Sequence, residues 1–421
     1  MRYAPGDLER RRQELEERRR QRRRRRRRQA VVASLVVVAA LAMAAVGFYF
    51  AYQRGMRSLG MSDSAAGAST GVSRRVTMLL VGTDSTGRGS GRTDTIMVAS
   101  FDPRTGEAGI MSIPRDTRVQ IPGRSGFHRI NTAYALGGPE LTVRTVEALL
   151  GVNIDHVVVV DFDSFARFID LLGGVQIHVD QPMRYDDFAQ GLHIDIRPGP
   201  QVLTGEQALH YVRFRDALGD VALIDPARDV YGGRVRRQLE FVRAVVEQAM
   251  QLDVVPKLPQ LVPELLTMVE TDLSLDRALA LALSARRLDL DRLKTEVLPG
   301  TGRWIGGASY WVHDPVRTDI VVRKIILGET VTTLEVLNGG GSAGMAGRAA
   351  DLLRRSGYDV VRTGNAPGGF RYERTQIIVN RPGVAVEPLV RLLGGQVSYA
   401  GQDPSETGAD VTVILGRDFR G

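Results

Sequence analysis

The chain of 421 residues contains no cysteine, which excludes a disulfide scaffold and thiolate chemistry. It also lacks the G-K-[ST] sequence of a P-loop and the H-E-x-x-H sequence of a zinc peptidase. The six histidines are scattered, and none has a metal-ligand partner at a suitable spacing. ATP hydrolysis and zinc catalysis are therefore not expected.

Lysine is nearly absent, because only Lys257, Lys294 and Lys324 occur and arginine supplies almost all of the positive charge. The formal net charge of +8 is concentrated in residues 1–29, which hold 14 arginines against 5 acidic residues. The rest of the chain is close to neutral, so we expect no nucleic-acid partner. Because arginine is so common here, one isolated arginine is a weak sign of function.

An apolar run from Ala30 to Phe50 carries no charge in 21 residues. As a helix it would be about 31 Å long, enough to cross a bilayer core of about 30 Å. We therefore predict a single transmembrane helix over residues 30–52, with interfacial aromatic anchors at Phe48, Tyr49, Phe50 and Tyr52. The arginine-rich tail, residues 1–29, would stay cytoplasmic, and the bulk of the chain would lie outside the cell membrane.

Two alternatives apply to this N-terminal region. The apolar run could belong to a cleaved signal peptide, because small-residue patterns such as Ala42-Met43-Ala44 occur in it. The arginine-rich tail could bind nucleic acid or anionic lipid instead of setting the topology.

The remaining chain divides into a stalk and two domains. Residues 53–73 are rich in Gly, Ser and Ala, which predicts a flexible stalk. From residue 74 to about 328, strand-like and helix-like runs alternate, as is typical of an α/β domain. Its predicted strands are 76–81, 95–101, 108–113, 155–161 and 175–179, and its predicted helices are 141–150, 162–172, 203–211 and 234–251.

The helix predicted from residue 203 begins with a capping box, in which Gln207 follows Thr204 by three residues. Residues 331–421 predict a small βαββαβ domain. Its elements are strand 333–337, helix 343–356, strands 359–362 and 375–379, helix 386–393 and strand 410–415.

Two carboxylates lie beside glycine turns at strand ends. Asp84 follows the first predicted strand, and Asp94 stands ten residues later, just before the second. Brought together, they would supply hard oxygen ligands for Mg²⁺ (or Mn²⁺) while leaving positions for phosphate oxygens. Spacing alone favours a purely structural role, in which Asp84 caps a turn and Asp94 begins a strand.

Several arginines also fall at the ends of predicted elements, where loops carry function. A guanidinium group binds phosphate through two parallel hydrogen bonds, so a group of converging arginines would suit a pyrophosphate. The candidates are Arg92, Arg115, Arg129, Arg213, Arg215, Arg234 and Arg237, and Gln238 shares a helix face with the last two.

At these residues the chain resembles the LytR-CpsA-Psr family of cell-envelope proteins. The resemblance spans about residues 76–249 through V-G-T-D, G-R-T-D-T-I-M, S-I-P-R-D-T-R-V-Q-I-P-G, R-I-N-T-A-Y-A-L-G-G-P, L-T-G-E-Q-A-L-H-Y-V-R-F-R and R-V-R-R-Q. The last segment is similar to the LytR C-terminal domain through T-L-E-V-L-N-G-G-G-S-A-G-M-A and A-D-V-T-V-I-L-G-R-D-F.

The resemblance implies a mixed-sheet αβα catalytic domain that transfers a glycopolymer from a polyprenyl-pyrophosphate carrier to peptidoglycan. It implies that Asp84 and Asp94 hold Mg²⁺. The catalytic residues would be Asp94, Arg115, Arg213, Arg215 and Asp220. The pyrophosphate would be bound by Arg92, Arg115, Arg129, Arg213, Arg215, Arg234 and Gln238.

The chain departs from the family pattern after Gly219-Asp220. In the family an Arg-x-x-Arg-Gln sequence follows closely, whereas here thirteen residues intervene before Arg234. Asp225 or Asp229 could therefore replace Asp220, and Arg228 competes with Arg234. We favour Asp220 and Arg234.

The mechanism implied is electrostatic, with Mg²⁺ and the arginines stabilising the leaving pyrophosphate as an acceptor hydroxyl attacks the anomeric carbon. Either Asp94 or Asp220 could deprotonate the acceptor. The apolar carrier tail would need a slot in the core, for which V-V-V-V-D-F-D-S-F and the helices after it are candidates. Two other functions stay open, a hydrolase that uses water as acceptor and a non-enzymatic membrane-bound regulator.

Overall fold

The structure is a computed structural model that describes residues 74–84, 93–187, 192–216, 219–225, 230–250, 268–274, 277, 281, 284, 287–399 and 408–420. The predicted cytoplasmic tail, transmembrane helix and stalk lie outside these residues, as do Arg92, Arg228 and Asp229. No helix within the described part of the chain is long and apolar enough to cross a bilayer.

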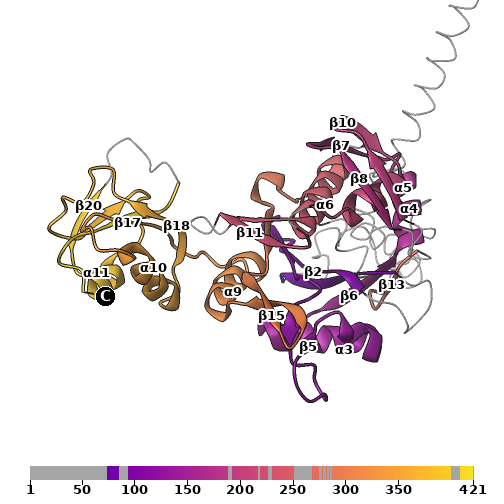
Figure 1. Ribbon diagram of the computed structural model, residues 1–421, viewed down its shortest axis with the longest axis horizontal. Coiled ribbons are helices and arrows are strands. Elements are labelled where there is room, and N and C mark those ends of the chain that lie inside the picture. The colour runs from indigo at the N-terminus through magenta and orange to yellow at the C-terminus, as the bar shows by residue number, and fades with distance from the viewer. Residues whose placement is uncertain are drawn as a thin grey trace, which may run out of the picture.

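Two α/β lobes lie side by side along the longest axis of the molecule (Figure 1). The larger lobe is built on a mixed six-stranded sheet. Its strands, in spatial order, are β13 (Glu270–Thr271), β6 (His156–Asp161), β1 (Val76–Thr83), β2 (Thr93–Phe101), β3 (Ala108–Ser112) and β14 (Lys294–Val297). The central strands are almost continuously apolar because helices cover both of their faces.

One face of this sheet carries α4 (Phe162–Leu171), α5 (Gly205–Arg213) and α6 (Arg234–Met250). The other face carries α3 (Thr132–Leu150), α9 (Pro315–Val321) and the π-helical turn η4 (Val322–Ile326). The larger lobe is therefore a three-layer αβα arrangement (Figure 1), as the resemblance implied.

The sequence patterns located the helices well where caps were visible. Thr204 and Gln207 form the expected capping box at the start of α5, and Asp161 caps α4 by accepting a hydrogen bond from the Ser164 amide. Helix α3 begins nine residues before its predicted start. Gly137 and Gly138 have non-helical backbone angles and Pro139 follows them, so only the part beyond this kink has a regular helical pattern.

Short two-stranded ribbons complete the larger lobe and were mostly not predicted. They pair β4 (Arg118–Val119) with β5 (His128–Arg129), β7 (Val175–Val179) with β10 (Gly199–Leu203), β8 (Met183–Asp187) with β9 (Leu192–Ile196), β11 (Ala222–Asp225) with β12 (Val230–Gly232), and β15 (Gly300–Ile305) with β16 (Ala308–His313). A short 3₁₀ turn, η3 (Leu290–Arg292), precedes β14.

The smaller lobe has its own apolar core and contains one strand more than predicted. Its elements are β17 (Thr333–Asn338), α10 (Met345–Arg355), β18 (Asp359–Asn365), β19 (Gln376–Val379), α11 (Glu387–Leu393), β20 (Gln396–Tyr399) and β21 (Val411–Leu415). The sheet order is β18-β17-β21-β19-β20. The predicted βαββαβ order is therefore wrong by the edge strand β20, whose four residues are all exposed and so carry no alternating apolar pattern.

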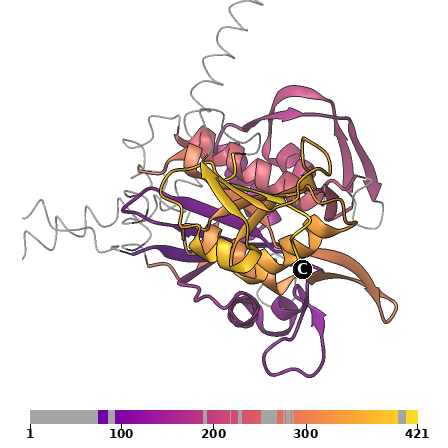
Figure 2. The same ribbon diagram turned by 90° about the vertical axis from the view of Figure 1, so that its left-hand side faces the viewer.

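The two lobes also meet through side chains. Lys324 Nζ of η4 lies 2.5 Å from Asp359 Oδ2 of β18. Viewed from its left-hand side, the smaller lobe covers part of the larger one (Figure 2), while the β15–β16 hairpin and the segment between β4 and β5 project from the edge.

Candidate functional site

The site lies at one end of the central strands of the six-stranded sheet, where a β-bulge redirects Asp94. Gly82 pairs with Thr95 and Thr83 pairs with Thr93, so Asp94 has no partner across the strand pair. A bulge of this kind redirects the side chain of the extra residue and frees its backbone groups. The Asp94 carbonyl accordingly lies 3.5 Å from Arg234 Nη2 at the start of α6.

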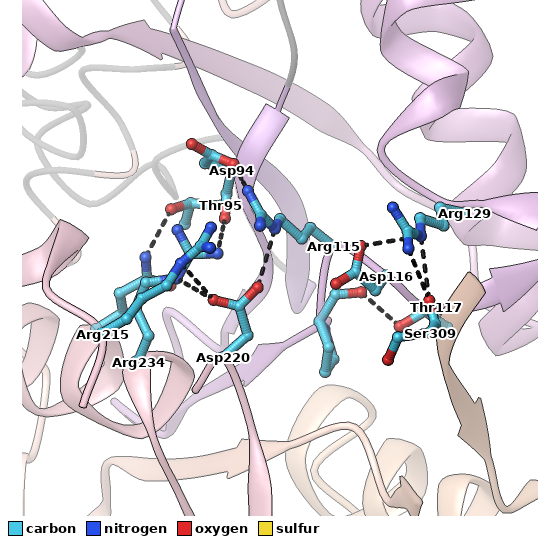
Figure 3. Close-up of polar contacts among 12 residues, drawn as sticks. Asp94, Thr95, Arg115, Asp116, Thr117, Arg129, Arg215, Asp220, Arg234 and Ser309 are labelled. Atoms are coloured by element: carbon cyan, nitrogen blue, oxygen red, sulfur yellow. Dashed lines mark hydrogen bonds and ion pairs between the residues drawn. The ribbon is translucent and has the colours of Figure 1, made fainter. Parts of the chain in front are cut away.

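Arg115 joins the two acidic residues of the site (Figure 3). It lies in the turn after β3, where the Thr117 hydroxyl donates a hydrogen bond to the Pro114 carbonyl at 2.5 Å. Its Nη1 forms an ion pair with Asp94, and its Nε donates to Asp220 Oδ2 at 3.0 Å. One planar guanidinium group thus fixes the separation of two carboxylates that are 126 residues apart in the chain.

Asp220 is surrounded by three arginines. In addition to Arg115, Arg215 Nε and Arg234 Nε each lie 3.0 Å from Asp220 Oδ1. Both contacts have the distance of an ion pair without the alignment of a hydrogen bond. Asp220 is therefore the centre of the cluster, whereas Asp225 lies in β11.

The thirteen residues that separate Asp220 from Arg234 form the β11–β12 hairpin. Its two ends meet, because the Arg234 amide donates to the Gly219 carbonyl at 3.1 Å and the Val235 amide donates to the Asp220 carbonyl at 3.0 Å. Gly233 has a φ of 87°, and a Cβ there would lie 3.1 Å from the Asp220 carbonyl oxygen. Asp220 and Arg234 are thus in contact despite the insertion between them.

The cluster has more positive than negative charge. Two carboxylates, Asp94 and Asp220, face three guanidinium groups. Burial lowers the pKa of Arg234, and although Asp220 opposes this change, nearby Arg115 lowers it further. Burial would raise the pKa of Asp94, yet Arg115 and Arg234 outweigh it and hold that pKa below its ordinary value. An additional anion would therefore be stabilised here.

Arg237 holds the segment that carries Arg215 through contacts with the residues on either side of it. Arg237 is 8% exposed, donates to the Phe214 carbonyl at 2.7 Å and forms an ion pair with Asp216 at 2.5 Å. We had grouped Arg237 with the candidate anion-binding arginines, but its contacts fix the backbone on both sides of Arg215 instead. Asp216 gave no sequence signal for this role beyond its position next to Arg215.

Gln238 connects the charged cluster to an apolar cavity. Its Nε2 donates to the Thr95 hydroxyl at 3.1 Å and to the Val212 carbonyl at 3.2 Å. Gln238, Thr95 and Val212 all line a cavity of about 280 Å³ between the sheet and helices α4, α5 and α6. Thr95 was not predicted as a site residue, although it alternates with Asp94 on β2 and so points to the helical side.

The cavity runs the length of the sheet and is almost entirely apolar. Near the cluster it is lined by Phe162, and at the other end it is lined by Phe101, Leu288 and Leu293. Val158, Val160 and Phe165 also line it, so the segment V-V-V-V-D-F-D-S-F does border an internal slot, as predicted.

Two predicted site arginines lie outside the ion-pair cluster. Arg213, the last residue of α5, stacks over the Phe162 ring at 4.7 Å and so lies at the cluster end of the cavity. Arg129 forms an ion pair with Asp116 at 3.3 Å and donates to the Ser309 carbonyl at 3.0 Å, to the right of the cluster in Figure 3. It therefore links β5 to the β15–β16 hairpin.

The predicted magnesium ligands Asp84 and Asp94 offer hard oxygen donors at one end of the sheet. Asp84 directly follows Thr83, which pairs with Thr93, so Asp84 and Asp94 lie at the same end of β1 and β2. The Thr93 hydroxyl is buried there without a hydrogen-bond partner. Within the described residues, no group of three or more acidic or histidine side chains could hold a metal ion.

Comparison with known proteins agrees with this architecture. Residues 51–324 match the model of the LytR_cpsA_psr family, which is more than half of the chain. The chain belongs to the LytR-CpsA-Psr family. Residues 331–419 match the model described as LytR cell envelope-related transcriptional attenuator, which corresponds to the smaller lobe.

Members of this family include two curated relatives from Gram-positive bacteria. The regulatory protein MsrR of Staphylococcus aureus is 36% identical over 201 residues, which is 47% of this chain and 57% of MsrR. The chain thus matches little more than half the length of MsrR. The polyisoprenyl-teichoic acid–peptidoglycan teichoic acid transferase TagU of Bacillus subtilis is 29% identical over 248 residues, or 59% of this chain and 76% of TagU.

A solved LytR-CpsA-Psr structure shares the fold of the larger lobe. The crystal structure of B. subtilis TagV superposes with a TM-score of 0.52 at 26% identity, covering 61% of this chain and 99% of TagV. The mixed α/β sheet is therefore the family architecture.

Proposed function

We propose that this protein is a membrane-anchored transferase that moves a glycopolymer from a polyprenyl-pyrophosphate carrier onto peptidoglycan. The activity named for its relative TagU supports this proposal. The predicted transmembrane helix over residues 30–52 would place the two lobes outside the cell membrane, on the side of the wall.

The observation that carries the proposal is the direct junction of a cationic cluster with an apolar cavity. Thr95 and Gln238 hydrogen-bond to each other at the cluster and also line the cavity. A polyprenyl pyrophosphate has the same two parts, a dianionic or trianionic head and an apolar tail. Its head would lie among the arginines while its tail would occupy the cavity.

The direction of the cavity also suits a carrier anchored in a membrane. Its apolar end, at Phe101 and Leu288, lies at the end of the sheet where β1 begins with Val76. Residue 74 is the first described residue after the predicted stalk. The head of the carrier would therefore be held at the opposite end of these strands, where the wall acceptor can approach.

In the proposed reaction an acceptor hydroxyl attacks the glycopolymer at its bond to the carrier. That bond breaks, and its electron pair moves to the leaving phosphate oxygen. Arg115, Arg215 and Arg234 would bind the phosphate oxygens and stabilise the charge that grows on them, since their donors are already oriented by Asp220. Asp84 and Asp94 would hold Mg²⁺ (or Mn²⁺), which when bound neutralises part of the pyrophosphate charge.

The acceptor proton must pass to a base as the hydroxyl attacks. Asp94 is poorly suited to this role, because Arg115 and Arg234 lower its pKa and so weaken it as a base. Asp220 contacts three arginines, so we assign both carboxylates to charge binding, and the acceptor proton passes to solvent.

The decisive experiment incubates the full-length chain in detergent with Mg²⁺ and a labelled glycan-loaded polyprenyl pyrophosphate, with and without peptidoglycan fragments. Mass spectrometry then follows the label. Label on the fragments, lost in Arg115→Ala, supports the transferase. Release of free glycan alone would indicate a hydrolase, and an unchanged but bound lipid would indicate a binding protein.

A cavity variant separates tail binding from head binding. Ala99→Phe would project a larger side chain into the cavity from β2 while leaving every cluster residue in place. We expect it to weaken binding of long-chain carriers and to spare carriers with a short prenyl chain. Equal weakening for both carriers would argue against a tail in the cavity.

The names of the relatives also favour one rival function, a membrane-bound regulator. MsrR is called a regulatory protein, and the smaller lobe matches a domain described as a transcriptional attenuator. A regulator that acts through its arginine-rich tail would lose its effect on transcription when residues 18–28 are deleted. The same regulator would be unaffected by the Arg213→Ala, Arg215→Ala double substitution, whereas the transferase would be inactivated.

A further inference from the structure

The β15–β16 hairpin carries both tryptophans of the chain, in two very different environments. Trp311 is 3% exposed, donates from its indole to the Leu298 carbonyl at 3.0 Å and packs edge-on against Tyr231. Trp304 is 76% exposed. Trp311 is therefore part of the core, whereas the exposure of Trp304 has no explanation in the packing of the larger lobe.

The strand register defines what surrounds the exposed indole. Trp304 lies opposite Ser309, and Gly302 lies opposite Trp311. Directly opposed residues in an antiparallel pair share a face, so Trp304, Ser309 and Gly302 form one surface with Trp311 at its base. A Cβ on Gly302 would meet nothing within 4 Å, so the strand beside the indole is open. We call Trp304, Ser309 and Gly302 the tryptophan face.

The tryptophan face is continuous with the candidate site. Trp311, at its base, packs against Tyr231 of β12, and the backbone amide of Trp311 donates to the Asp116 carbonyl at 3.0 Å, one residue after Arg115. The β11 strand, which lies beside β15, begins two residues after Asp220. The hairpin therefore contacts the segments that carry Arg115 and Asp220.

The surrounding charge suits an anionic polymer. Neither the hairpin, residues 300–313, nor the neighbouring segment, residues 118–129, contains an acidic residue. Together they carry four arginines, which are Arg118, Arg124, Arg129 and Arg303, and of these Arg129 forms an ion pair with Asp116 at 3.3 Å. Arg129 joins the two segments by its hydrogen bond to the Ser309 carbonyl.

Given the proposed transferase function, on which this inference rests, we infer that the tryptophan face binds the acceptor glycan of peptidoglycan. The apolar C–H face of a pyranose ring stacks on an exposed indole, and the Ser309 hydroxyl and the bare strand at Gly302 accept the polar edge of the sugar. The arginines attract the carboxylates of the peptides that the glycan carries. The acceptor hydroxyl is thereby presented to the phosphate held at Arg115.

A membrane surface is the main rival occupant, since exposed tryptophan and arginine also occur at lipid interfaces. The geometry favours the glycan, because the hairpin begins at the end of the sheet that bears Asp94, and β1 begins with Val76 at the other end. The predicted membrane anchor precedes the Val76 end in the sequence.

The kinetic test uses the full-length chain in detergent with the labelled carrier and peptidoglycan fragments. Trp304→Ala should raise the acceptor KM about tenfold while release of glycan to water, without acceptor, stays unchanged. Gly302→Val should do the same, because it fills the open space but leaves the indole present and Gly302 needs no positive φ. Tyr399→Ala is the matched control, since Tyr399 is 75% exposed on the smaller lobe and should have no effect.

A binding test needs no activity. Acrylamide should quench the Trp304 fraction of the tryptophan emission, and peptidoglycan fragments should protect it in the wild type but leave no protectable fraction in Trp304→Phe. If the wild type turns over no carrier while the fragments still protect Trp304, the transferase proposal fails and the glycan-binding face stands.

Two results would overturn the inference. One is a wild-type acceptor KM in both Trp304→Ala and Gly302→Val. The other is quenching of Trp304 by brominated phosphatidylcholine in reconstituted vesicles without any protection by peptidoglycan fragments, which would make this face a lipid contact.

Discussion

Each lobe of the molecule contains a partly or fully buried carboxylate that contacts arginine, but the two carboxylates differ in how much positive charge surrounds them. In the smaller lobe, Glu335 accepts from Arg362 at 2.9 Å and from the Thr412 hydroxyl at 3.4 Å. In the larger lobe, Asp220 faces three guanidinium groups within 3.0 Å. The charge of Glu335 is balanced by one arginine, whereas Asp220 faces three.

The difference distinguishes a structural ion pair from a binding site. A single arginine is enough to compensate a buried carboxylate, as in the Glu335 pair. Three arginines around Asp220 repel one another, and the lowered pKa of Arg234 reflects burial together with that repulsion. A further anion would relieve this repulsion, so the excess charge at Asp220 is the feature that supports an anion-binding role.

The largest effect should come from Arg115→Ala, which removes the group that contacts both Asp94 and Asp220. We expect kcat/KM for glycan transfer to fall about 10²–10³-fold, the usual cost of losing one oriented donor at a developing negative charge. Radiolabel transfer to peptidoglycan measures it.

The matched control is Arg104→Ala. Arg104 lies 3.0 Å from Asp102, just after the opposite end of β2. The substitution therefore removes an arginine–aspartate ion pair at the other end of that strand. This variant should transfer at the wild-type rate. An equal loss in both variants would mean that the Arg115 effect is structural.

A smaller loss should follow from Gly233→Ala, which tests whether the β11–β12 insertion positions Asp220. The new Cβ would lie 3.0 Å from the Gly219 carbonyl oxygen and 3.1 Å from that of Asp220, at a φ of 87°. We expect about tenfold slower transfer as Asp220 moves, on the basis of about 1–2 kcal/mol of backbone strain.

Gly383→Ala separates strain from displacement. Gly383 has a φ of 84° but open space around its Cβ position, and it lies in the smaller lobe. It should lower stability without slowing transfer. Normal transfer by Gly233→Ala would show that Asp220 does not depend on the ends of the hairpin.

The sequence predicted the parts of this site that depend on short, regular patterns. The capping box fixed the start of α5 and hence Arg213, and the apolar stripe of α6 placed Arg234 and Gln238 on one face. The bulge at Asp94 was not predictable, because a register shift depends on the pairing of β1 with β2 and leaves no mark in either strand alone.

Long-range contacts explain what the sequence did not show. Arg129 lies in a segment that carried the resemblance, yet its partner Ser309 is 180 residues away in a hairpin that none of those motifs includes. Strand β20 was missed because it is exposed on both sides. In both cases tertiary neighbours, not local preference, decide the structure.

A still smaller effect is expected from pH, through Asp94. Its folded-state pKa lies below the ordinary value of 3.8, so its charge contribution is complete above about pH 3.8 and is lost only as pH falls through the lower folded value. The ratio of carrier affinities between wild type and Asp94→Asn should therefore stay constant within about twofold from pH 5 to 8. Using the ratio cancels titration of the pyrophosphate itself, and a ratio that changes strongly near pH 6 would show that Asp94 titrates there.

The smallest effect on transfer should come from Arg362→Ala, which removes the single arginine that contacts Glu335. Glu335 is 4% exposed, so its loss of a partner should cost about 1–3 kcal/mol of stability in the smaller lobe. Faster hydrogen exchange of the β17 and β18 amides would report that cost, while glycan transfer should remain at the wild-type rate. Because Arg115→Ala should give the opposite pattern, with slow transfer and normal exchange, the two variants test whether a carboxylate with one arginine and a carboxylate with three serve different purposes. If Arg362→Ala slowed transfer as strongly as Arg115→Ala, the smaller lobe would have to take part in the reaction, and excess charge would no longer identify the site.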